Sequence, residues 1–242
     1  MSKYVDLIAW DDCPHLLPPH IPQEELDELQ ASMAPHQREA RRTGRPALGS
    51  GAIYPVAEGD FIIDPIPIPE HWGQTYALDV GWNCTAAIFV AHDPERDTFY
   101  LTAEYYGKQR EPVVHAHSIV AMQPYKMIGA IDPAADQSNQ KDGTKLKEAY
   151  EEFGLDLVRA NNAVEAGLHH VLVLMQTGRL KVFRSLTNWI KEVRLYRRDE
   201  KGKIVKKNDH LMDATRYALN TDGIFRAKPT TRSHTTRRYG EW

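Results

Sequence analysis

The chain has 242 residues, of which 42% are hydrophobic, and its 30 basic and 33 acidic residues give a net charge of −3. This length suits one full core with an appendage, or two small domains. No run of about 18 apolar residues is present, so we expect no membrane span. Cys13 and Cys84 lie far apart with no signal peptide ahead of them, which predicts reduced thiols in a cytoplasmic protein.

Residues 1–72 differ in composition from the rest of the chain. They contain two proline-rich stretches, a basic and glycine-punctuated stretch, and a single helix-like run at 22–33. Proline and glycine at this density interrupt regular structure. We therefore expect a linker segment here, around one small helical element.

From residue 73 the pattern changes to alternating strand and helix signals. Three β-rich runs separated by short turns predict an antiparallel meander, at 75–81, 85–93 and 98–107. Helices and strands then alternate, with helices predicted at 111–122, 142–154, 163–178 and 185–198 and strands at 127–133, 155–161 and 180–183. This order predicts one α/β domain over 73–224, a mixed sheet with helices on both faces. Residues 225–242 read as a basic, flexible tail.

Positive charge is concentrated in one segment of an otherwise acidic chain. Between Lys191 and Lys207 there are eight basic residues against three acids. The turn residues of DEKGKIVKK (199–207) lie between charged arms, which predicts a basic hairpin. A charged run of this kind is usually a solvated face, but its single sign and its position directly before the last helix favour contact with DNA phosphates.

Two acids stand at the ends of apolar strands. Asp79 lies in YALDVGWN, and Asp132 follows the buried strand of MIGAIDPAAD. Each alone could be a turn residue, before Gly81 or before Pro133. Burial of a carboxylate among apolar neighbours is costly unless it binds a cation or a donor, and ligands of open α/β sheets bind at strand ends. The two acids together therefore indicate a site.

The closing helix begins near NDHLMDATRY (208–217) and adds a third acid. Residues three and four apart share a face, so Asp213 lies beside both His210 and Asp209, and the two carboxylates repel. Asp209 competes with Asn208 for the helix N-cap, and we favour a cap for Asp209 and a ligand for Asp213. No lysine lies within these acidic motifs, so three carboxylates from separate elements suit hard dications such as Mg²⁺ or Mn²⁺.

Four of these segments, taken in order, resemble the C-terminal nuclease half of the large terminase subunit of tailed bacteriophages, a ribonuclease H-like nuclease. They are ALDVGW (77–82), IDPA (131–134), YRRDEKGKIVKKND (196–209) and DHLMDATRY (209–217). WDDCPHL (10–16) and GSGAIYPV (49–56) look like the segment that joins the motor to the nuclease in that family. The resemblance implies a ribonuclease H-like fold and cleavage of double-stranded DNA with little sequence specificity.

The resemblance also implies a role for each site residue. Asp79, Asp132 and Asp213 would be catalytic and would hold two Mg²⁺ or Mn²⁺ ions, with His210 assisting by donating a proton or by binding a metal. His210 could equally be a half-exposed helix histidine. DNA would be contacted by the hairpin residues Arg197, Arg198, Lys201, Lys203, Lys206 and Lys207.

The family further implies partners and a setting. The full-length protein would work with the phage portal protein and the small terminase subunit, in the host bacterial cytoplasm at the procapsid. Its ATPase motor is expected outside this chain, because Ser50 and Gly51 stand where a phosphate-binding loop needs lysine and a hydroxyl residue.

Two rival functions stay open. DVGWNCT also suits an actin-like ATPase or kinase, although no second phosphate loop follows IDPA. A non-catalytic module that binds DNA or the portal is the other rival, with acids that merely cap and turn. Asn162 and Glu165 match a capping box, which favours a structural role for Glu165 over a metal role.

Overall fold

The structure is a computed structural model that describes residues 51–136, 145–199 and 201–229, together with Pro22, Glu24, Glu25 and Glu28. Cys13, most of the predicted helix-like run at 22–33 and residues 230–242 of the tail predicted at 225–242 lie outside the described residues. Within the described part of that tail, Arg226 forms an antiparallel backbone bridge with Gln74. No helix among the described residues is long and apolar enough to cross a membrane.

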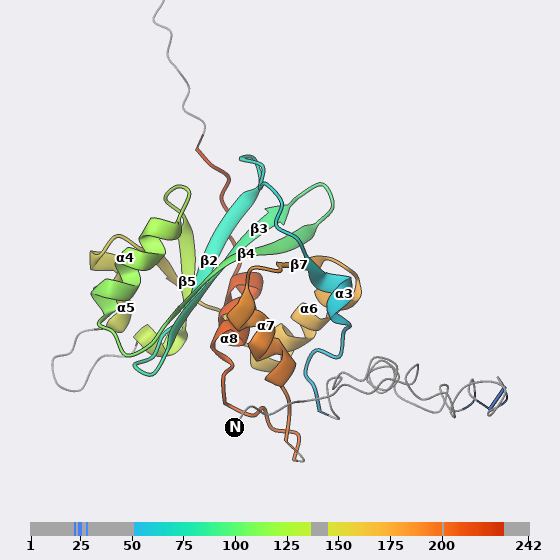
Figure 1. Ribbon diagram of the computed structural model, residues 1–242. Coiled ribbons are helices and arrows are strands. Elements are labelled where there is room, and N and C mark those ends of the chain that lie inside the picture. Colours follow the sequence, from blue (N-terminus) through green and yellow to red (C-terminus); the bar gives the residue numbers. More distant parts are fainter. Residues whose placement is uncertain are drawn as a thin grey trace, which may run out of the picture.

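A seven-stranded mixed sheet forms the centre of the molecule (Figure 1), in the order β1-β7-β4-β3-β2-β5-β6. The predicted meander is confirmed as three antiparallel strands, β2, β3 and β4, because β3 pairs with both of its neighbours in that sense. Parallel strands extend it on each side. The strands are β1 (Ile62–Ile63), β2 (Gly73–Asp79), β3 (Thr85–Asp93), β4 (Thr98–Gly107), β5 (Ile128–Ile131), β6 (Asp156–Arg159) and β7 (Leu180–Phe183).

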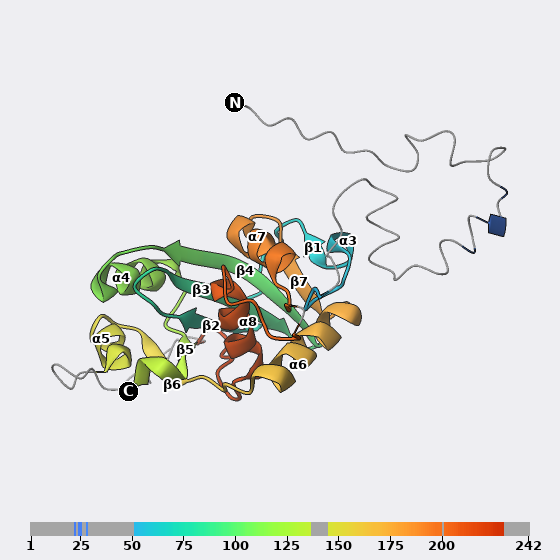
Figure 2. The same ribbon diagram turned by 90° about the horizontal axis from the view of Figure 1, so that it is seen from below.

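Helices cover both faces of the sheet, as the sequence predicts. One face packs against α4 (Pro112–Met122) and α5 (Leu146–Glu152), and Figure 2 shows both on the side of the sheet away from α7. The other face carries the larger core. Its helices are α3 (Glu58–Phe61), α6 (Val164–Gln176), α7 (Thr187–Leu195) and α8 (His210–Asn220).

Helix α8 is the central helix of the larger core. It contacts β2, β3 and β5 in the sheet and both α6 and α7 beside it. The residues that its periodicity assigns to the core are all buried, namely Leu211, Ala214, Ala218 and Leu219. Polar residues of this helix are therefore held in fixed positions close to the sheet.

Part of the segment before residue 73 packs against the domain. Ile53, Tyr54 and Phe61 are buried in the larger core, and β1 adds an edge strand beside β7. A strand of two residues leaves too short a signal to be predicted from sequence. The domain boundary at 73 stays a prediction, and the structure adds that residues 51–72 contribute to the same core.

The first turn of α7 is capped by a carboxylate from the sheet. Glu104 of β4 accepts hydrogen bonds from the backbone N–H groups of Asn188 and Trp189, both at 2.8 Å, and from the Asn188 side-chain amide at 2.9 Å. These N–H groups have no partner within the helix, and a negative charge at a helix N-terminus is favourable. The contact fixes α7 to the strand that carries Glu104.

We expect Glu104→Ala to lower the free energy of unfolding by about 2 kcal/mol, because it leaves the first-turn N–H groups of α7 without a charged acceptor. Urea denaturation followed by circular dichroism measures this change. Glu95→Ala, at an exposed position in the turn between β3 and β4, is the control and should stay within about 0.5 kcal/mol of the parent. Equal stability of the two variants would contradict the capping role.

Candidate functional site

Two of the predicted site residues lie at adjacent strand ends. Strands β2 and β5 are parallel, and Leu78 is in register with Ile131. Asp79 is the next residue on one strand and Asp132 the next on the other, so both carboxylates stand at the same edge of the sheet. The Asp132 N–H donates to the Leu78 carbonyl at 3.1 Å, which extends the pairing by one step.

Helix α8 brings the third acid and the histidine to this edge. His210 Nδ1 lies 2.7 Å from Asp79 Oδ2, across 131 residues of sequence. The negative charges of Asp213 and Asp132 both contribute to raising the pKa of Asp79, after the larger contribution of its own burial. Bonding to Asp79 raises the pKa of His210. The four residues thus form one electrostatic cluster.

Tyr217 lies close to this cluster and was not singled out from the sequence. Burial raises its pKa first, and the negative charges of Asp132, Asp213 and Asp79 raise it further. A phenol whose pKa responds to all three carboxylates marks the place where they converge. Only the spacing of Tyr217 from Asp213, four residues along the same helix, could have indicated it from the sequence.

Asp213 is paired with two cations, contrary to the expectation that no lysine compensates the acids. Its Oδ2 is 2.8 Å from Lys206 Nζ, and its Oδ1 is 3.1 Å from Arg216 Nη2. Lys206 comes from the basic hairpin, which folds back onto α8, whereas Arg216 is one turn further along the helix. The spacing of the arginine could be recognised in the sequence, but the fold of the hairpin could not.

Lys206 also lies between the two acids whose repulsion is expected from their spacing. Its Nζ is 3.2 Å from Asp209 Oδ2, close enough for an ion pair, although the angles are not those of a hydrogen bond and this buried oxygen has no hydrogen-bond partner. The ammonium group therefore sits between Asp209 and Asp213. It thus lies beside Asp213, one of the three acids predicted to hold a dication.

The predicted side-chain cap of α8 by Asp209 is wrong. Asp209 is the N-cap residue by position, but its side chain makes no capping bond. The Leu211 N–H instead donates to Glu192 Oε2 of α7 at 2.7 Å. Glu192 is 3% exposed, and its partner is on another helix, so no local motif could reveal it.

The predicted capping box at Asn162 and Glu165 is also wrong. Helix α6 begins at Val164 after Ala163, with no side-chain cap. The Asn162 Oδ1 accepts from Arg216, and Glu165 pairs with Arg198 of the hairpin at 2.6 Å. Two arginines from elsewhere in the fold thus take the place of the local motif. Glu165 joins α6 to the hairpin.

The predicted DNA-contacting residues of the hairpin divide into two groups. A bridge between Arg198 and Ile204 confirms that the segment turns back on itself. Arg198 and Lys206 are held in ion pairs within the chain. Among the described residues, the other four make no ion pair, and these are Arg197, Lys201, Lys203 and Lys207.

The acids fit a divalent cation by their chemistry rather than by a formed ligand cage. As the side chains stand, the described residues hold no group of three His, Cys, Asp or Glu placed to bind a metal ion. The electrostatic potential is nevertheless strongly negative here. Asp132 and Asp213 raise the pKa of Asp79, and the Lys206 ammonium group lies between Asp209 and Asp213. Oxygen donors of this kind suit Mg²⁺ or Mn²⁺.

Burial raises the pKa of Glu192 above its usual range. The folded protein therefore favours the neutral acid, so stability falls as the pH rises from the unfolded-state pKa through the folded-state value. Glu192→Gln keeps an oxygen for the Leu211 N–H but has no proton to lose. We expect the stability of the variant relative to the parent to increase with pH across this window.

Chemical denaturation of parent and variant at a series of pH values measures that difference. Glu152→Gln, at an exposed position of α5, is the control and should give a flat difference. If the stability difference between Glu192→Gln and the parent also stays constant with pH, burial does not raise the pKa of Glu192, which contacts the start of α8.

Comparison with known proteins gives consistent matches to this region. The model of the family described as the terminase RNaseH-like domain matches residues 77–222. The large terminase subunit of Enterobacteria phage LP7 is 36% identical over an alignment of 206 residues, which covers 82% of this chain but 43% of that protein. The chain thus spans less than half the length of this curated relative.

Solved structures support the same fold. The nuclease domain of the P22 large terminase is 32% identical with a TM-score of 0.68, covering 75% of this chain and 97% of that one. The large terminase nuclease of thermophilic phage G20c, solved with bound cobalt, is 12% identical with a TM-score of 0.51, covering 70% of this chain and 97% of that one. The latter likeness concerns the fold alone.

Proposed function

The chain belongs to the family of terminase RNase H-like domains, and on this premise we propose that it is a divalent-metal-dependent endonuclease that cuts double-stranded phage DNA during packaging. The observation that carries the proposal is the convergence of Asp79, Asp132 and Asp213 from two strand ends and one helix. All three, together with His210, lie inside the matched range. The match favours a nuclease over the actin-like ATPase.

We assign metal binding to Asp79, Asp132 and Asp213, with two Mg²⁺ or Mn²⁺ ions as the resident cations. Such ions, when bound, supply an activated water and neutralise charge on the phosphodiester. The cobalt bound by the G20c nuclease supports a divalent metal in this fold. The effect of the other two acids on the pKa of Asp79 supports the same site.

The cations around Asp213 set the charge of the site. Arg216 is 1% exposed and lies on the buried side of Asp213, so it holds one carboxylate oxygen in place. Lys206 is largely exposed at its side chain and can turn away from Asp213. Lys206 would then be free to contact a DNA phosphate, the role that the sequence assigns to it.

His210 is oriented by the first acid. Its Nδ1 is engaged by Asp79, and its side chain is about one-third exposed, 32%. The interaction with Asp79 raises the pKa of His210 and so favours the imidazolium form. We assign His210 a proton-donating role toward a phosphate or a leaving oxygen.

The hairpin supplies DNA contacts that carry no sequence information. Its lysine and arginine side chains suit backbone phosphates, whereas base reading needs side chains placed in a groove. Arg197, Lys201, Lys203 and Lys207 make no ion pair among the described residues and are available for such contacts. Cleavage is therefore expected to be largely indifferent to sequence.

The wider setting is part of the proposal, because the chain covers less than half of its curated relative. We propose that the full-length protein adds an ATPase motor and acts with the portal protein and the small terminase subunit. Its place would be the host bacterial cytoplasm, at the procapsid. A basic tail beyond residue 229 would extend the DNA or portal contact.

We expect Asp79→Asn, Asp132→Asn and Asp213→Asn each to abolish metal-dependent nicking of supercoiled plasmid, because each removes a charged oxygen ligand. Gel assays with Mn²⁺, Mg²⁺ or EDTA measure the loss. Asp156→Asn is the matched control. Asp156 is exposed at the first residue of β6, and the starts of the parallel strands lie at the other end of the sheet from Asp79 and Asp132. Normal cleavage by all three variants would refute the assigned ligands.

The hairpin variant combines three substitutions, Lys201→Ala, Lys203→Ala and Lys207→Ala. We expect it to bind duplex DNA more weakly and with a smaller dependence on salt. The logarithmic slope should fall by about 0.9 for each phosphate that the variant no longer neutralises. Fluorescence anisotropy over a range of NaCl concentrations measures it in EDTA, where cleavage does not interfere. An unchanged slope would remove the hairpin from the DNA interface.

A further inference from the structure

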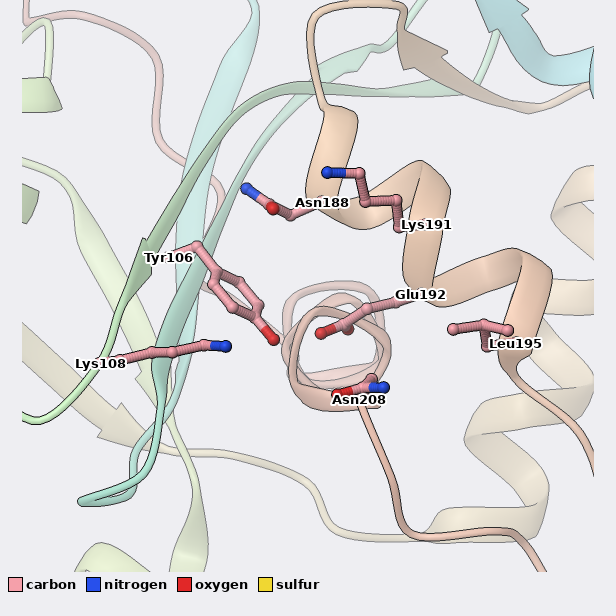
Figure 3. Close-up of a pocket in the computed structure, with 7 residues that line it drawn as sticks. All are labelled: Tyr106, Lys108, Asn188, Lys191, Glu192, Leu195 and Asn208. Carbon is pink, nitrogen blue, oxygen red and sulfur yellow. The ribbon is translucent and has the colours of Figure 1, made fainter. Parts of the chain in front are cut away.

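A cavity of about 290 Å³ opens beside the acidic cluster, lined by seven residues. Figure 3 shows Tyr106 and Lys108 on one side and α7 on the other, with Asn208 between them. The lining residues on α7 are Asn188, Lys191, Glu192 and Leu195. The cavity therefore lies where β4, α7 and the start of α8 meet.

Two contacts and one sequence neighbour join this cavity to the proposed catalytic centre. The ring of Tyr106 packs edge-on against that of His210, with 6.4 Å between centroids. Asn208 lines the cavity and directly precedes Asp209 and His210. The Gln109 N–H donates to the Trp82 carbonyl at 3.1 Å, which ties the segment carrying Lys108 to the loop that follows Asp79.

Two lysines reach into the cavity from opposite sides. Lys108 lies 5.7 Å from the centroid of the Tyr106 ring, and Lys191 projects from α7 (Figure 3). Among the described residues, neither takes part in an ion pair, whereas Arg194, on the same helix as Lys191, is paired with Glu58. Both lysines are exposed. Their charge is therefore available to a ligand.

The rest of the lining suits an anion with oxygen acceptors. Glu192 is the single acid against two lysines, and one of its oxygens is already bound by the Leu211 N–H. The lining thus keeps a net positive charge. The amide of Asn208 can donate a hydrogen bond to a phosphate oxygen.

We propose that this cavity binds a backbone phosphate of the DNA strand being cut, next to the phosphodiester at the acidic cluster. Each strand of duplex DNA carries a phosphate about every 3.4 Å along the helix axis, so neighbouring phosphates must lie beside the scissile one. The hairpin and the cavity flank the start of α8, and the strand runs between them. This inference rests on the proposed nuclease function and adds Lys108 and Lys191 to its DNA contacts.

The test is the salt dependence of duplex binding by the full chain in EDTA, for the double variant Lys108→Ala/Lys191→Ala. One phosphate in the cavity predicts a logarithmic slope smaller by about 0.9, and so up to about eightfold weaker binding at 0.1 M salt. Arginine at both positions keeps the charge and should restore the slope. Circular dichroism verifies that each variant is folded.

Lys126→Ala is the matched control. Lys126 is exposed and, among the described residues, makes no ion pair, but it precedes β5 and so lies at the sheet edge opposite to Asp132. Its removal should leave the slope unaltered. An equal loss for Lys126→Ala would show a general charge effect and would overturn the assignment of a phosphate to the cavity.

The remaining outcomes separate this inference from the function on which it rests. Parent-like binding by the double variant, with weakened binding by the hairpin variant, would overturn the cavity assignment and leave the nuclease proposal standing. Inorganic phosphate could instead stabilise the parent against heat but not the double variant, while both bind DNA equally well. That result would overturn the DNA assignment and assign the cavity to free phosphate. A parent chain that neither binds nor cuts DNA with any metal would overturn both.

Discussion

Mutual repulsion among carboxylates at one sheet edge is the constraint around which the site is built. Asp79 and Asp132 end adjacent parallel strands, and Asp213 approaches them from α8. The charges of Asp132 and Asp213 raise the pKa of Asp79, so they make the ionisation of this acid less favourable. Nearby positive charge offsets this repulsion and favours the ionised form of the acids.

The fold supplies those cations from two different elements. His210 and Arg216 of α8 contact Asp79 and Asp213 respectively, and Lys206 reaches from the hairpin to the other oxygen of Asp213. Arg216 is buried and fixed, whereas Lys206 is exposed and exchangeable. This difference suits the proposed uptake of dications, because one cation can leave while another keeps the carboxylate in position.

Strands β2 to β7, helices α4 to α8 and the positions of three acids at their ends could be predicted from the sequence because their signals are local. Helix α3 and strand β1 are too short to give such a signal. Runs rich in apolar and β-forming residues mark β2 to β4, and Asp79 and Asp132 stand at the ends of apolar runs. The role of Glu192 could not be predicted, since its partner Leu211 is on another helix. The pairing of Lys206 likewise depends on how the hairpin folds back. The capping box at Asn162 failed because α6 starts after Ala163 and Asn162 accepts from Arg216 instead.

The central claim is that Asp79, Asp132 and Asp213 bind divalent metal together. Anomalous scattering from a crystal soaked in Mn²⁺ tests it most directly, because it locates the ion relative to each carboxylate. The account predicts anomalous density among the three acids, with Lys206 turned away from Asp213. Density elsewhere, or none while Lys206 stays on Asp213 at saturating Mn²⁺, would contradict it.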